Sequence, residues 1–226
     1  MRGRHGAAVL CLACGLAAAQ VAPTSSEVAR YSGLFAAAQR GDAAQVAQLA
    51  AAGANVDARD GHGRTPLHVA TFAGKHEAMR ALARAGVDPN ALEGDRYDIV
   101  TIAAVADDVP TLDVALAIGC RATNITSRWY GTALIAAAHL GHDGAVRTLI
   151  RAGAPLDHVN NLGWTALIES IVLGNGGPRH LATLEALVAA GANVNLADRS
   201  GTTPLALARA AGYRDMVVAL ERAGAR

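Results

Sequence analysis

A unit that returns about every 33 residues constrains the fold of this chain more than any other sequence feature. Glycines close the successive units at intervals of 33, 33, 34, 38 and 33 residues: Gly53, Gly86, Gly119, Gly153, Gly191 and Gly224. A unit of this length holds two short helices and a turn, and such a pair cannot bury its apolar faces alone. The units must therefore stack and supply a hydrophobic core to one another.

One of these units shows how the local sequence encodes two helices. Thr65 and Pro66 are typical of a helix start, because threonine caps free backbone N–H groups and proline lacks one. Gly74 is suited to end that helix in the left-handed conformation. A second helix is expected over about 76–84. The segment 87–96, VDPNALEGDR, is rich in turn-forming residues and predicts an extended finger that leads to the next unit.

Repeats of this length, with TPLHVA at 65–70 and GANVDA or GANVNL at a closing glycine, resemble the ankyrin repeat family. The resemblance implies an all-α repeat protein, an ankyrin-type solenoid of stacked helix-turn-helix units joined by β-hairpin-like finger loops. It covers residues 32–226: an N-terminal capping unit at 32–59, repeats at about 60–92, 93–126, 127–159 and 160–197, and a C-terminal repeat at 198–226.

Residues 1–19 have the pattern of a secretory signal peptide and are followed by an expected linker at 20–31. Two arginines precede an apolar run over 7–19, which is too short to cross a membrane core about 30 Å thick. We expect cleavage after Ala19, which would give a periplasmic or secreted protein. A lipoprotein anchored through Cys14 is the alternative. The alanine-rich composition and the short leader indicate a bacterial protein.

The charge and cysteine content exclude several classes of function. A net charge of +1 without a basic stripe argues against binding to the phosphate backbone of a nucleic acid. Cleavage after Ala19 would leave Cys120 as the single cysteine, so no intramolecular disulfide could form. We expect a monomer without a cofactor or a membrane span.

The groups that could carry chemistry are sparse, and the chain is predicted not to be an enzyme. His139 and His142 lie three residues apart, but no third zinc ligand is near them. Arg179 and His180 belong to an insertion at 174–180 and precede a helix start, where an anion could bind. A metal- or anion-dependent activity at these places is the alternative. Structural histidines and a flexible insertion are the favoured interpretation.

The resemblance implies a protein-binding module, because ankyrin-like stacks usually present their fingers and first helices as a concave surface for another protein. Variable positions taken in register predict aromatic and aliphatic anchors on this surface, with charged finger residues such as Arg64 at its margins. The predicted partner-binding residues are Phe72, Tyr97, Trp129, Tyr130, His139, Leu140, Leu162, Trp164, Val172 and Leu173. The partner itself is not specified by the sequence. Some similar periplasmic ankyrin proteins are linked to catalase, so an accessory role in envelope stress or peroxide defence is an alternative.

Overall fold

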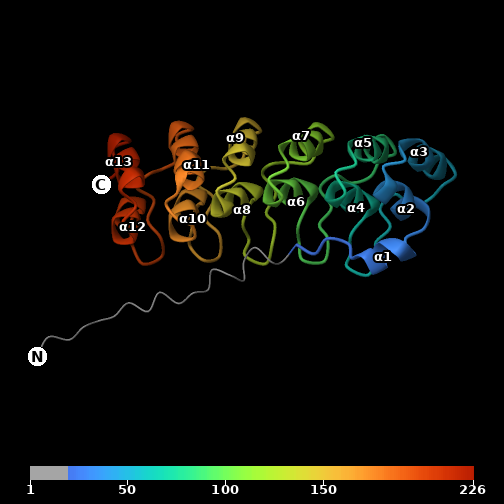
Figure 1. The fold of residues 1–226 in the computed structure, drawn as a ribbon, viewed down its shortest axis with the longest axis horizontal. Helices are drawn as coiled ribbons and strands as arrows, with labels where there is room; N and C mark the ends of the chain where they lie inside the picture. Colours follow the sequence, from blue (N-terminus) through green and yellow to red (C-terminus); the bar gives the residue numbers. More distant parts are fainter. Residues whose placement is uncertain (1–19) are drawn as a thin grey trace, which may run out of the picture.

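The computed structural model describes residues 20–226, and it arranges their helices side by side along one axis (Figure 1). The helices are α1 (Ser25–Arg30), α2 (Gly33–Arg40), α3 (Ala43–Ala51), α4 (Pro66–Phe72), α5 (His76–Arg84), α6 (Ile99–Val105), α7 (Val109–Ala117), α8 (Ala133–Leu140), α9 (Asp143–Arg151), α10 (Ala166–Val172), α11 (Pro178–Ala189), α12 (Pro204–Ala211) and α13 (Arg214–Arg222). The predicted signal peptide, with Ala19 and Cys14, lies outside the described residues.

From α2 onward the helices form two rows (Figure 1). The even-numbered helices make an inner row from which the fingers project, and the odd-numbered helices from α3 make an outer row. Each helix packs against its partner in the same unit and against the equivalent helix in the next unit. The predicted all-α solenoid of helix-turn-helix units is confirmed. Every helix in the described part of the chain is too short or too polar to span a membrane.

The core repeats as regularly as the sequence does. Each inner helix from α4 onward buries a branched apolar residue at its second position: Leu67, Val100, Leu134, Leu167 and Leu205. Three residues later each helix buries a small residue, Ala70, Ala103, Ala137, Ser170 or Ala208. These small side chains allow neighbouring helices to approach closely while the larger ones fill the space between units.

From α4 onward the inner helices begin where the sequence predicts, because the side chain of the residue before each one caps it. The side chains of Thr65, Asp98, Thr132, Thr165 and Thr203 each accept a hydrogen bond from a backbone N–H in the first turn. A cap of this kind contributes about 1 kcal/mol to the free energy of unfolding.

The fingers close by a shared pattern of hydrogen bonds. Asp60 Oδ1 accepts bonds from the backbone N–H groups two and four residues later, at 2.9 and 3.0 Å. Glu93, Asn160 and Asp198 do the same in their own fingers. Neighbouring fingers are also joined, since the N–H of Gly94 donates to the carbonyl of His62 at 2.8 Å. The fingers are therefore held at fixed positions beside the inner helices.

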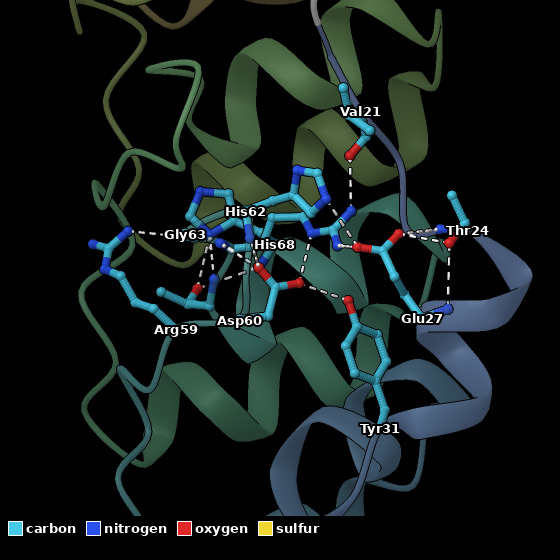
Figure 2. A network of polar contacts seen from close by, with 11 residues as sticks. Val21, Thr24, Glu27, Tyr31, Arg59, Asp60, His62, Gly63 and His68 are labelled. Carbon is cyan, nitrogen blue, oxygen red and sulfur yellow. Dashed lines mark hydrogen bonds and ion pairs between the residues drawn. The ribbon is translucent and has the colours of Figure 1, made fainter.

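The segment 20–31, predicted to be a linker, instead contains α1 and packs against the first finger. Glu27 on α1 accepts a bond from the guanidinium of Arg64 at 2.5 Å, and the Val21 carbonyl accepts another at 3.0 Å. The Tyr31 hydroxyl donates to Asp60 at 2.7 Å (Figure 2). The linker prediction needs correction, because these bonds join the segment to the repeats.

Arg64 also differs from its predicted place at the exposed margin of the groove. Its side chain is fully buried. Besides Glu27 it contacts Asp60, whose Oδ2 accepts a bond from the Arg64 Nε at 2.7 Å. A guanidinium without water needs carboxylate and carbonyl acceptors around it, and the N-terminal segment supplies two of the three. We call Arg64, Glu27, Asp60 and Tyr31 the N-terminal cluster.

Candidate functional site

A pocket of about 570 Å³, its open mouth included, lies between the fingers and the helices α6, α8 and α10. We call the surface formed by the fingers and the inner row the inner face. The pocket lies at the middle of this face, and three consecutive units contribute to it together with Gln20 of the N-terminal segment.

Five of the ten predicted partner-binding residues line this pocket. They are Tyr97, Trp129, His139, Leu140 and Leu162. Tyr97 is buried, with 6% of its surface exposed, and the others are half-buried. Equivalent positions in successive repeats therefore predicted correctly that residues from three units, up to 65 residues apart in the sequence, lie close together.

The other five predicted residues do not line the pocket. Phe72 borders a neighbouring hollow formed with α6. Trp164 and Leu173 are half-buried, whereas Val172 and Tyr130 are exposed. The Tyr130 ring lies 5.7 Å from the guanidinium carbon of Arg96, an arrangement that suits a cation–π contact. Of the two tryptophans, Trp129 alone lines the pocket. Whether any of the ten residues binds a partner stays a prediction.

Glu169 is a charged pocket residue that the sequence prediction missed. Its carboxylate, with 5% of the side chain exposed, accepts a bond from Asn160 Nδ2 at 2.7 Å. His139 Nδ1 lies 3.2 Å from the other carboxylate oxygen. The corresponding positions of the other inner helices hold the apolar residues Val69, Ile102, Ala136 and Leu207. The single carboxylate inside the apolar run ALIESIV could therefore have indicated a candidate functional site.

The bond from His139 to Glu169 determines what the pocket offers to a ligand. If Nδ1 donates to the carboxylate, then Nε2 is the ring atom left for other partners, and none of the residues 20–226 bonds to it. A buried carboxylate is costly unless donors surround it, and here two side-chain donors are in place. The site combines one carboxylate, one imidazole and aromatic walls, which suits recognition of a polar group on an apolar stem.

His139 and His142 have different partners in the structure, which argues against the alternative of a metal site at these two histidines. His142 Nδ1 lies 3.0 Å from the carbonyl oxygen of Ala104, in the preceding unit, whereas His139 faces Glu169 in the following one. Within residues 20–226 no three histidine, cysteine or acidic side chains are grouped as a metal ion would require. The two rings act as bridges between units.

The insertion at 174–180 is anchored, in contrast to the flexible loop that was predicted. Arg179 donates to Asp107 at 2.5 Å and lies 3.7 Å from Asp143. His180 Nε2 lies 3.0 Å from the carbonyl oxygen of His139. The hydrogen bond to Asp107 raises the pKa of Arg179 above its usual range. Two carboxylates already neutralise this guanidinium. Arg179 is therefore not free to bind an anion, as the alternative interpretation requires.

His68, from the TPLH sequence, has a structural environment. Its Nδ1 accepts a bond from the N–H of Thr65 at 3.1 Å, and its Nε2 lies 3.3 Å from the carbonyl oxygen of Tyr97. Burial lowers the pKa of His68 to about 4, because a charged ring would be desolvated. The neutral ring joins one repeat to the next.

Comparisons with known proteins agree with this architecture. The family described as Ankyrin repeats (3 copies) matches residues 5–93 and 100–198. An ankyrin repeat protein of Escherichia coli, YahD, is 32% identical over 190 residues, which cover 84% of this chain and 94% of that protein. The crystal structure of an ankyrin repeat domain from Acinetobacter baumannii is similar with a TM-score of 0.79 and 42% identity, covering 85% of this chain and 98% of that one. The ankyrin repeat domain of Bcl-3 is similar with a TM-score of 0.77 and 27% identity, covering 87% and 88%.

Proposed function

Because this chain belongs to the ankyrin repeat family, whose repeats are protein–protein interaction modules, we propose that its inner face binds a protein partner. The fold is generally a non-enzymatic scaffold, and the proposed role is binding without catalysis. The residues most important for binding would be those around the central pocket.

The pocket itself is the observation that carries this proposal. Apolar side chains from three units, including Trp129, Leu140 and Leu162, converge there with a few polar groups. Binding energy at protein interfaces concentrates where aromatic and aliphatic anchors meet in a pocket surrounded by polar residues. On the outer row, by contrast, the hollow between α11 and α13 is lined largely by charged and small residues such as Glu185, Asp215 and Arg222.

The proposal is tested with truncations on the two faces of the solenoid. We expect Trp129→Ala and Leu140→Ala each to weaken binding of the isolated partner by about 2 kcal/mol, as loss of an interface anchor does. Val218→Ala on α13, where the side chain is 43% exposed, is the matched control and should leave affinity unchanged. Calorimetry gives the affinities, and circular dichroism verifies the folds. Equal affinities of all folded variants would refute the role of the inner face.

We further propose that the protein is exported and acts in the bacterial cell envelope, where its partner would also reside. The support is the sequence of residues 1–19, a basic start followed by a short apolar run. Intact mass of the protein from the periplasmic fraction should correspond to a chain that begins at Gln20. A cytoplasmic protein that retains Met1 would contradict export, and a lipidated Cys14 would favour the lipoprotein alternative.

A further inference from the structure

We propose that the pocket around Glu169 accepts the side chain of an arginine from the partner protein. This inference rests on the proposed function, since it assumes that the inner face is the binding surface. It adds the chemistry of the group that enters the pocket, which neither the fold nor the family specifies.

The first argument is charge. Glu169 is the one acidic residue that lines the pocket, and neither lysine nor arginine lines it. Its two described partners are the amide of Asn160 and the imidazole of His139, so a neutral imidazole leaves the pocket with a net negative charge. A cation that displaces water here would meet a carboxylate in a desolvated environment, where attraction between charges is much stronger than in water.

The second argument is the shape and chemistry of the walls. Trp129 and Tyr97 line the pocket, and aromatic rings attract a planar guanidinium both by stacking and by the cation–π effect. Gln20 also lines the pocket, and its side-chain Nε2 has no partner among the described residues. Acceptors in the lining include the carboxylate oxygens of Glu169 and, when Nδ1 carries the proton, the Nε2 atom of His139. Arginine offers five N–H donors and no acceptor, which fits this set.

The third argument is the placement of the nearby arginines of this chain, which do not occupy the pocket. Arg96 lies over the Tyr130 ring, and Arg128, with 64% of its side chain exposed, is 3.6 Å from a carboxylate oxygen of Asp95. Both arginines therefore have other partners within this chain. The interior of the pocket keeps its single carboxylate available for a cation from outside.

The experiment compares two small probes on the unmodified protein. Nα-acetyl-arginine amide and Nα-acetyl-citrulline amide have nearly the same shape, but only the first is charged. Titrations followed by NMR report on the indole N–H signals of the two tryptophans, which Trp164→Phe distinguishes. We expect the arginine probe to shift the Trp129 signal with at least about tenfold higher affinity than the citrulline probe, as a hydrogen bond to a charged group implies.

Two matched substitutions then test the role of the carboxylate. Glu169→Gln should reduce the preference for arginine over citrulline to less than about twofold, because it removes the charge and keeps the size. Glu185→Gln, the same change on the exposed surface of α11, should keep the full preference. Unfolding curves verify that each variant is folded. The comparison of probes on the unmodified protein stands even if Glu169→Gln does not fold.

Several results would overturn the inference. These are equal affinity of the two probes for the unmodified protein, a preference that survives in folded Glu169→Gln, or shifts confined to Trp164. The proposed function fails separately, because it is judged by partner binding of Trp129→Ala and Leu140→Ala. If those variants lose partner binding but the protein shows no preference for the arginine probe, the inner face remains the interface. Only the inference that an arginine side chain enters the pocket is then refuted.

Discussion

Two clusters of buried polar side chains lie at different places along the solenoid. They differ in whether all their hydrogen-bonding groups have partners within the described part of the chain. The N-terminal cluster surrounds Arg64, and each bond of that guanidinium ends on an acceptor of this chain. The cluster of His139, Glu169 and Asn160 borders a pocket and leaves one ring nitrogen without a partner among the described residues. The buried charge of the first cluster has its partners within the chain, and we propose that the buried charge of the second serves recognition.

The largest effect expected from this comparison is loss of stability when Arg64 is removed. Arg64→Ala leaves Glu27 and Asp60 close together without their cation and releases the segment before α1. Loss of one partner from a buried ion pair costs about 3–5 kcal/mol of the free energy of unfolding. Urea denaturation measures the change.

Arg209→Ala is the control for this substitution. Its guanidinium pairs with Glu221 on the last unit, but both side chains are about half exposed. Exposed pairs contribute about 1 kcal/mol or less, so the two variants should differ by several-fold in their effect. Equal effects would show that the N-terminal cluster is no more important than a surface pair.

The next effect is loss of stability in acid, through His68 beside the N-terminal cluster (Figure 2). The folded pKa of about 4 lies below the unfolded value of 6.5, so the unfolded chain binds the extra proton first as the pH falls. The contribution of neutral His68 is complete above pH 6.5 and is lost as the pH falls toward 4, by about 3 kcal/mol.

The acid effect is measured by urea unfolding at pH 7, 5.5 and 4, in parallel for the parent and His68→Gln. The variant lacks this proton and should lose about 3 kcal/mol less than the parent over that range. Identical pH profiles would mean that His68 titrates normally, in conflict with its burial and with the bond that Thr65 donates to Nδ1.

The smallest effect is expected at the second cluster. Glu169→Gln keeps an acceptor for Asn160 and removes a buried charge, so the free energy of unfolding should change by about 1 kcal/mol or less. Thermal and urea unfolding measure it. A loss as large as that of Arg64→Ala would assign Glu169 to folding and would remove the contrast between the two clusters.

The fold was predictable from the sequence because its signals are local and repeated. The closing glycines, the threonine and proline at helix starts and the apolar positions of each unit all encode the same pair of helices. The N-terminal segment was not recognised, although TSSE at 24–27 is a capping-box sequence. Its packing depends on Arg64, and the repeat pattern places that residue on an exposed finger. A contact across 37 residues has no local signature.

The site was predictable in part for the same reason. Aligning equivalent positions of the repeats identified five of the lining residues, because each unit places the same positions on the inner face. They are Tyr97, Trp129, His139, Leu140 and Leu162. The depth of the pocket depends on how the units pack, which is why Trp164 and Leu173 lie outside it. Glu169 could have been found by comparing equivalent positions. The contacts of Arg179 with Asp107 and Asp143 join three units and could not.

The most direct test of the central claim is a site-specific crosslink on each face of the solenoid. The photoreactive residue p-benzoylphenylalanine is placed at position 140 in the pocket or at position 218 on α13, in cells that produce the protein. The account predicts a defined crosslinked product from position 140, which Trp129→Ala weakens, and none from position 218. A product from position 218 alone would contradict it, because the partner would then bind the outer row.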